Sequence, residues 1–139
     1  MARKARCYCG ASHLSFSQEP LQVVYCHCDD CRRWTGAAAA VLAAFDDDSV
    51  RGVETIGAPR SFAEGVQRWN CPECGSPMMG RFDYVPGQSW VPLGVIEDAS
   101  DLTPEFHCFA DRRHPWVDDA GLPGSNGSGR DTLNAAAQK

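Results

Sequence analysis

Eight cysteines in a chain of 139 residues constrain the fold more than any other feature of this sequence. Seven of them fall into three short groups, C-Y-C-G from Cys7, C-H-C-D-D-C from Cys26 and C-P-E-C-G from Cys71. The basic residues before Cys7 lead into the first group without the apolar segment of a secretory signal, so we expect a cytoplasmic protein with reduced thiols. Clustered thiols in such a protein are usually metal ligands or redox groups.

The C-P-E-C-G group is typical of a zinc knuckle, because its proline and glycine shape a tight turn that brings two thiolates onto one metal. Zinc bound by thiolates is tetrahedral, with Zn–S distances of about 2.3 Å, so two more sulfurs must come from another part of the chain. The C-Y-C-G group is the natural donor. We therefore expect a closed structural zinc site made of Cys7, Cys9, Cys71 and Cys74. A disulfide or free buried thiols would be the alternative, which a reducing compartment disfavours.

The middle group predicts a different kind of site. Cys26, Cys28 and Cys31 can reach one metal by themselves, which leaves a fourth tetrahedral position without nearby sulfur. Such an open zinc site binds water, a carbonyl oxygen or a thiol, and it is typical of catalysis. Alternatively, Cys108 completes a second closed site, although Phe106 and Cys108 share one face of an expected strand, which favours a core cysteine. A third interpretation is thiol exchange at Cys28 and Cys31, which tight zinc binding would exclude.

Cationic and aromatic residues follow the middle group directly. Arg32, Arg33 and Trp34 are candidates for holding an anionic substrate beside the metal, through bidentate contacts and stacking. His27 points away from Cys26 and Cys28 if the segment is extended. We therefore expect His27 to lie outside the ligand set, either behind it or at the surface.

The hydrophobic pattern predicts a mainly β protein. Residues 12–18 and 21–25 alternate with period two and are expected to form a hairpin. The apolar run Ala37–Phe45 is expected to be a buried strand, with a short alanine-rich helix as the alternative. Further short strands are predicted at Val53–Ile56, Met78–Tyr84, Ser89–Ile96 and Pro104–Phe109. We expect one domain over residues 1–120, and a mobile tail over residues 121–139, which have few large apolar side chains.

Charge and hydropathy argue against a nucleic-acid partner and against a membrane-spanning segment. The net charge is −5 and the basic residues are scattered, so the electrostatic attraction that drives nucleic-acid binding is missing. The longest apolar run, Ala37–Phe45, has nine residues, whereas a helix that crosses a membrane needs about 20. We expect no nucleic-acid partner and no membrane span.

The order of the motifs resembles one known family. The chain reads C-Y-C-G at 7–10, C-H-C-D-D-C-R-R-W-T-G-A at 26–37, C-P-E-C-G-S-P-M at 71–78, V-P-L-G-V-I-E-D at 91–98, and it closes with H-C-F at 107–109, Trp116 and G-L-P at 121–123. Together these motifs are similar to those of the glutathione-dependent formaldehyde-activating enzyme family, which also includes the centromere protein V type domain. The resemblance covers about residues 5–123. The chain departs from it at Cys108, where an aliphatic residue is more common, and at Asn70, where an aromatic residue is common.

The resemblance implies a β-tent fold of short antiparallel strands around two zinc ions per chain. It places the structural zinc on the first and third cysteine groups and the catalytic zinc on Cys26, Cys28 and Cys31. It implies a carbon–sulfur lyase activity like that of S-(hydroxymethyl)glutathione synthase, with a glutathione-like thiol as the small-molecule partner and formaldehyde or a related aldehyde as co-substrate. Asp29, Asp30 or His27 is the expected proton carrier. The alternative is a zinc-binding interaction module without catalysis.

Overall fold

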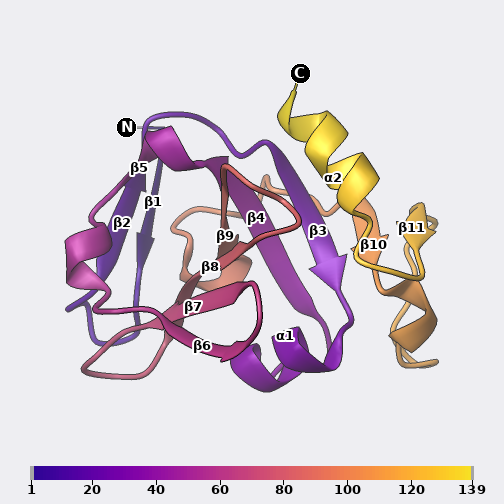
Figure 1. Ribbon diagram of the computed structural model, residues 1–139, viewed down its shortest axis with the longest axis horizontal. Helices are drawn as coiled ribbons and strands as arrows, with labels where there is room; N and C mark the ends of the chain where they lie inside the picture. Colours follow the sequence, from indigo (N-terminus) through magenta and orange to yellow (C-terminus); the bar gives the residue numbers. More distant parts are fainter. Residues whose placement is uncertain (1, 139) are drawn as a thin grey trace.

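Two β-sheets form the fold in the computed structural model, which describes residues 2–138 (Figure 1). The smaller sheet has the strand order β1-β2-β5, with β1 at Arg3–Arg6, β2 at His13–Phe16 and β5 at Val50–Arg51. The larger sheet has the order β11-β10-β3-β4-β9-β8-β7-β6. Its strands are β3 Gln22–Cys26, β4 Ala40–Asp46, β6 Arg60–Ala63, β7 Val66–Asn70, β8 Pro77–Phe82, β9 Gln88–Pro92, β10 Phe106–Cys108 and β11 Gly124–Ser125.

Helices are short and lie at the ends of strands. The two α-helices of the described residues are α1 at Asp29–Thr35 and α2 at Arg130–Ala137. Single 3₁₀ turns occur at η1 Asp47–Ser49, η2 Val53–Thr55, η3 Leu93–Val95 and η4 Ala110–Arg112. The prediction of a mainly β fold is therefore confirmed. No helix within residues 2–138 is long and apolar enough to span a membrane.

Strand β4 lies between two hydrophobic cores. Ala43 and Phe45 belong to the core that also contains Phe16 of the small sheet, and the Phe16 and Phe45 rings stack with their centroids 3.7 Å apart. Leu42 and Ala44 belong to a second core on the other face of the strand. Both faces of β4 are thus covered, which explains why its sequence is a continuous apolar run. The prediction of a strand rather than a helix is confirmed, with the strand beginning at Ala40.

The predicted hairpin of residues 12–18 and 21–25 is wrong. Strand β2 pairs with β1 and β5, whereas β3 pairs antiparallel with β4 and parallel with β10. Both strands exist, but they belong to different sheets. Alternation of polar and apolar residues sets which face of a strand is buried and says nothing about its partner. The strand predicted at Val53–Ile56 is also wrong, because Val53–Thr55 forms a 3₁₀ turn.

The last residues contain secondary structure where an irregular tail is expected. Strand β11 pairs with β10, and α2 lies beside β3 and β10 (Figure 1). Leu133 of α2 is buried, and its carbonyl accepts hydrogen bonds from the side chains of Gln22 and Gln88, at 3.0 and 3.3 Å. One leucine and its backbone thus anchor a segment that is otherwise poor in apolar side chains. The mobility of this segment stays a prediction.

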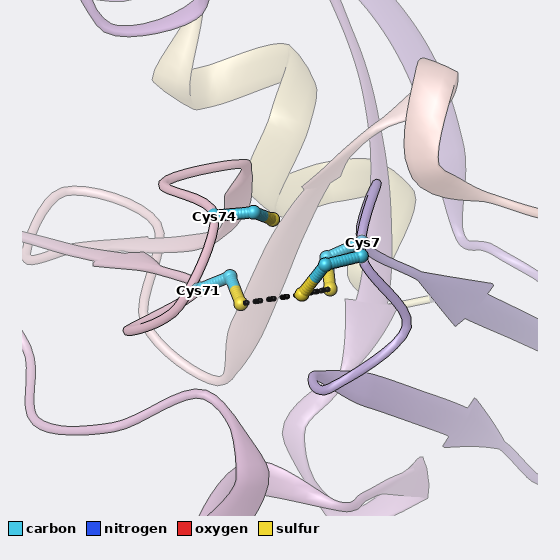
Figure 2. A group of neighbouring side chains, drawn as sticks. Cys7, Cys71 and Cys74 are labelled. Carbon is cyan, nitrogen blue, oxygen red and sulfur yellow. Dashed lines mark hydrogen bonds between the residues drawn. The ribbon is translucent and has the colours of Figure 1, made fainter.

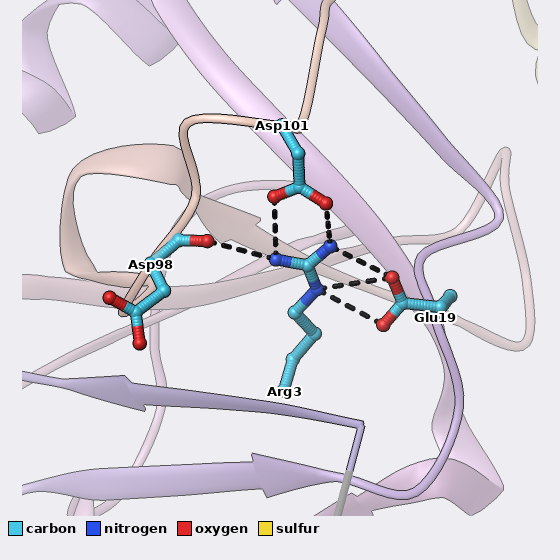
Figure 3. A network of polar contacts seen from close by, with 4 residues as sticks. All are labelled: Arg3, Glu19, Asp98 and Asp101. Carbon is cyan, nitrogen blue, oxygen red and sulfur yellow. Dashed lines mark hydrogen bonds and ion pairs between the residues drawn. The ribbon is translucent and has the colours of Figure 1, made fainter.

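A cluster of charged groups fixes the start of β1 (Figure 3). The Arg3 guanidinium donates to both carboxylate oxygens of Asp101, to Glu19 and to the backbone carbonyl of Asp98. The hydrogen bond from Arg3 lowers the pKa of Asp101. This network ties the strand that precedes the first cysteine group to two distant loops.

Candidate metal centres

The first cysteine cluster joins two turns that lie far apart in the sequence. Cys7 and Cys9 follow β1, and Cys71 and Cys74 lie in the turn between β7 and β8. Their four sulfur atoms lie within 4.8 Å of one another. The distances are 3.6 Å from Cys7 Sγ to Cys9 Sγ and 3.9 Å from Cys9 Sγ to Cys71 Sγ. Figure 2 shows Cys71 and Cys74 facing Cys7 across the centre of the cluster.

These distances fit a tetrahedral metal. Four thiolates at about 2.3 Å from one ion lie about 3.8 Å from each other. The backbone also prepares the site, since the N–H groups of Ala11 and Ser12 donate to the sulfurs of Cys9 and Cys7 at 3.4 and 3.2 Å. The Ser76 hydroxyl lies 3.1 Å from Cys74 Sγ, and this contact is the largest of several hydrogen bonds that together lower the pKa of Cys74 to about 5. Donors around the sulfurs favour the thiolate form that binds metal.

The knuckle turn has the backbone geometry that its sequence predicts. The Cys71 N–H donates to the Ser76 carbonyl at 2.8 Å, and the Gly75 N–H donates to the Cys71 carbonyl at 2.9 Å. Gly75 has a φ of +79°, a conformation that glycine adopts without steric cost. The turn thus orients both sulfurs to the same side.

The second cluster forms where β3 ends and α1 begins. The sulfurs of Cys26, Cys28 and Cys31 lie within 4.8 Å of one another, with 3.4 Å between the Sγ atoms of Cys26 and Cys28. Cys28 caps the helix, because its sulfur accepts a hydrogen bond from the Cys31 N–H at 3.3 Å. The helix ends at Gly36, which has the left-handed conformation with a φ of +73°. The first turn of α1 thus brings Cys31 back to the sulfur atoms of Cys26 and Cys28.

The three thiols of the second cluster differ in pKa. Hydrogen bonds from the thiols of Cys26 and Cys31 lower the pKa of Cys28, and the Cys31 N–H and the Arg68 cation act in the same direction. The pKa of Cys26 is raised, because its proton is shared with Cys28 and Cys31 and its side chain is buried. Cys28 is therefore the first of the three to ionise, and the other two follow when a metal ion replaces their protons.

Cys108 lies outside the group of three sulfurs within 4.8 Å. It is buried in the core that contains Val24 and Leu42, on strand β10 beside β3. Burial raises the pKa of Cys108 to about 12. Among residues 2–138, the second cluster thus offers three sulfur ligands and leaves one tetrahedral position without a cysteine.

Arg68 of β7 lies at the second cluster, although nothing in the local sequence marks it. Its Nη2 is 3.7 Å from Cys31 Sγ. The guanidinium carbon lies over the rings of Trp34 and Phe82, at 4.8 and 5.3 Å from their centroids. A cation held on two aromatic faces beside a thiol stabilises the thiolate form.

The residues predicted to bind substrate separate into two groups. Arg33 and Trp34 border a groove beside the cluster. Arg32 instead pairs with Asp29 at 2.6 Å, donates to the Arg112 carbonyl at 3.0 Å and lies 3.2 Å from His114 Nε2. Arg32 thus holds the first turn of α1 to the segment after β10.

His27 is fully buried, so the option of a surface position is wrong. Its Nε2 lies 2.8 Å from Nδ1 of His107, whose Nε2 is 2.7 Å from the Asp119 carbonyl. Because a carbonyl only accepts, the neutral His107 carries its proton on Nε2, and Nδ1 then accepts from His27. The pKa of His27 is lowered to about 4, mainly because the side chain is buried and to a smaller extent because His107 lies beside it. The hydrogen bond between the two histidines thus holds the backbone between Cys26 and Cys28 against strand β10.

Comparison with known proteins gives the family. The family model described as glutathione-dependent formaldehyde-activating enzyme matches residues 2–112. A crystal structure of a Rhodobacter sphaeroides protein superposes with a TM-score of 0.58 at 22% identity, covering 88% of this chain and 99% of that chain, and this likeness shows a shared fold. A search of curated proteins finds no match to the sequence. Since the family model spans most of the chain, the protein belongs to the glutathione-dependent formaldehyde-activating enzyme family.

Proposed function

We propose that this chain is a zinc-dependent carbon–sulfur lyase-type enzyme that joins a glutathione-like thiol to formaldehyde or a related aldehyde. The observation that carries the proposal is the second cluster, in which three cysteines within 4.8 Å leave a fourth position for a ligand. Membership of the family supports the same chemistry. A purely structural second site would need a fourth protein ligand, and Cys108 lies outside the sulfur group.

The two clusters would hold one zinc ion each. The first, with four sulfurs, is closed and would be structural. The second would hold the catalytic ion on Cys26, Cys28 and Cys31. Zinc bound there would supply Lewis acidity, which lowers the pKa of a thiol or polarises an aldehyde oxygen.

The reaction needs one proton to move. The thiolate sulfur attacks the carbonyl carbon, a carbon–sulfur bond forms, and the electron pair of the C=O π bond goes to oxygen. That oxygen then takes the proton that the thiol lost, which gives an S-hydroxymethyl product. Among the three expected carriers, Asp29 is engaged by Arg32 and Arg112, and His27 is buried. Asp30 is exposed and borders the same hollow as Cys28 and Cys31, so we assign the proton transfer to it.

The activity test compares the zinc-loaded protein with a variant of the second cluster. Exchange between formaldehyde, glutathione and their adduct is followed by NMR, with and without protein. We expect acceleration by the wild type and none by Cys28→Ser, which removes one of the three sulfurs. Cys108→Ser is the matched control and should retain the acceleration. A wild-type protein with two bound zinc ions that leaves the exchange rate at its uncatalysed value would reject this substrate pair.

A further inference from the structure

A groove runs between α1 and the hairpin of β6 and β7. Arg33 and Trp34 form its wall on the helix side. Arg60 and Phe62 of β6 form the opposite wall, together with Arg68 of β7. Phe62 is 88% exposed, so a large aromatic side chain stands at the rim with nothing packed over it. The groove thus combines three cations with two aromatic rings.

The cations in this groove have no carboxylate partners. Within residues 2–138, none of the ion pairs includes Arg33, Arg60 or Arg68. Asp30 also borders the groove, which leaves a local charge of about +2 in a protein whose net charge is −5. An unpaired cationic groove on an acidic protein attracts small anions.

Two of the arginines are placed against each other by the sheet. Arg60 and Arg68 are directly opposite in the antiparallel pair of β6 and β7, so their side chains leave the same face. Like charges in this position repel each other. Furthermore, Nη1 of Arg68 is buried and has no hydrogen-bond partner within the described chain. An anion between the two guanidinium groups would remove the repulsion and satisfy the open donor.

The groove is continuous with the second cysteine cluster. Asp30, Arg33, Val66 and Arg68 border it and also border the hollow that contains Cys28 and Cys31. Arg68 stands at the junction, with Nη2 at 3.7 Å from Cys31 Sγ. A ligand whose thiol lies at the cysteine cluster can therefore extend past Arg68 towards Arg60.

We propose that this groove binds the carboxylate groups of an anionic thiol, with Arg60 and Arg68 as the carboxylate-binding pair. The inference rests on the proposed function, because it takes the thiol to lie at the second cluster. It assigns the recognition of the substrate mainly to the β6–β7 hairpin. The aromatic faces of Trp34 and Phe62 would cover the apolar part of the ligand. The site selects thiols that carry carboxylates over neutral thiols of the same reactivity.

The test compares two thiols on the zinc-loaded protein by calorimetric titration. Glutathione carries two carboxylates, and 2-mercaptoethanol carries none. The groove variants are Arg60→Gln and Arg68→Gln. Arg60 is exposed, so its replacement should leave the fold intact. Arg51→Gln is the control for the change in net charge. Arg51 is exposed and donates only to backbone carbonyls of its own turn. We expect a roughly tenfold rise in the glutathione Kd for each groove variant, as for a lost charge-assisted hydrogen bond. The 2-mercaptoethanol Kd should stay unchanged in Arg60→Gln and should rise less than the glutathione Kd in Arg68→Gln, because Arg68 also contacts Cys31. Arg51→Gln should alter neither Kd.

Three other outcomes overturn the inference in different ways. Wild-type protein that binds neither thiol contradicts the proposed function and the groove with it. Binding of both thiols, with no change in the glutathione Kd for Arg60→Gln and Arg68→Gln, leaves the proposed function standing and rejects the groove. If Arg68→Gln raised the Kd of glutathione and of 2-mercaptoethanol by the same factor, and Arg60→Gln changed neither Kd, Arg68 would act on the cysteine cluster alone.

Discussion

Trp34 Nε1 donates a hydrogen bond to Oδ1 of Asn70 at 3.0 Å, across 36 residues of sequence. Trp34 belongs to the helix that carries Cys31, and Asn70 directly precedes Cys71 of the knuckle. The same Asn70 side chain donates from Nδ2 to the Gly75 carbonyl at 3.0 Å, inside the knuckle. One side chain therefore connects the two cysteine clusters, and it stands at the position where the family commonly has an aromatic residue.

Replacing this connection should weaken the fold measurably. We expect Asn70→Leu to lower the free energy of unfolding by about 1–3 kcal/mol, because the Trp34 N–H and the Gly75 carbonyl lose their partner. Asn70→Asp keeps an acceptor for Trp34 and should cost less. Urea unfolding of the zinc-loaded proteins measures both values. An Asn70→Leu variant as stable as the wild type would show that the link carries no stability.

The first cluster should contribute more stability than any single hydrogen bond. Cys71→Ser removes one of four sulfurs, and we expect the loss of one metal ion per chain together with a large fall in the thermal midpoint, since binding of a structural zinc contributes directly to folding. Cys108→Ser is the matched control, because it also places a hydroxyl at a buried sulfur position. Cys108→Ser should lower the free energy of unfolding by about 1–3 kcal/mol, and both metal ions should stay bound. Metal content is read by mass spectrometry under native conditions, and equal content in the two variants would contradict the assignment of ligands.

The sequence predicts the cysteine clusters better than it predicts the strands around them. The spacing within each cysteine group is local, and tetrahedral geometry determines how many further sulfurs each group needs. Pairing of strands is not local, so the alternation around Leu14 and Val23 predicts two strands correctly and joins them wrongly. The sequence does not predict helix α1, for a different reason. Cys28 is read as a metal ligand in a segment with three cysteines, and its second role as the N-cap of the helix is not recognised.

The candidate groove shows the same limit. Arg33 and Trp34 are found from the sequence because they follow a cysteine group, whereas Arg60 and Arg68 lie in a hairpin with no motif. Only the pairing of β6 with β7, and the packing of Arg68 against α1, bring those cations to the site. Arg32 is adjacent in sequence to the cluster but its side chain is engaged elsewhere. Proximity along the chain thus identifies only one of the three arginines that border the groove.

The buried histidine pair predicts a loss of stability in mild acid. Burial lowers the pKa of His27 to about 4, below the 6.5 of an exposed histidine. Between these values the unfolded chain binds a proton that the folded chain does not, so this contribution is complete above pH 6.5 and is lost as the pH falls towards 4. A shift of this size corresponds to about 3 kcal/mol.

Urea unfolding between pH 7.5 and 5 checks this prediction. His27→Gln should lose less stability over that interval than the wild type, and His13→Gln, at an exposed position, should follow the wild type. Acid also releases metal from thiolates in all three proteins, so the quantity to compare is the difference between their slopes. Identical slopes for His27→Gln and the wild type would contradict the role of this histidine.

The Arg3 network predicts a salt-dependent contribution to stability. Arg3→Met removes the cation that Asp101 and Glu19 share, so we expect a lower thermal midpoint at pH 7. The difference from the wild type should shrink in 1 M NaCl, because salt screens charges near the surface. The difference should also shrink in acid, as the pH falls through the pKa of Asp101, which the hydrogen bond from Arg3 holds below its usual value of 3.8. Differential scanning calorimetry at two salt concentrations measures the effect, and a difference that grows with salt would refute the ionic explanation.

The central claim is that the cluster of Cys26, Cys28 and Cys31 holds a metal ion with one position open to a thiol. Native mass spectrometry of the zinc-loaded protein, before and after addition of glutathione, tests it most directly. We predict two zinc ions per chain at the start, and then one bound glutathione or the selective loss of one zinc, with Cys28→Ser starting at one zinc and ignoring glutathione. Two zinc ions that stay bound in the presence of excess glutathione, with no added mass, would contradict the claim and favour a closed, structural pair of sites.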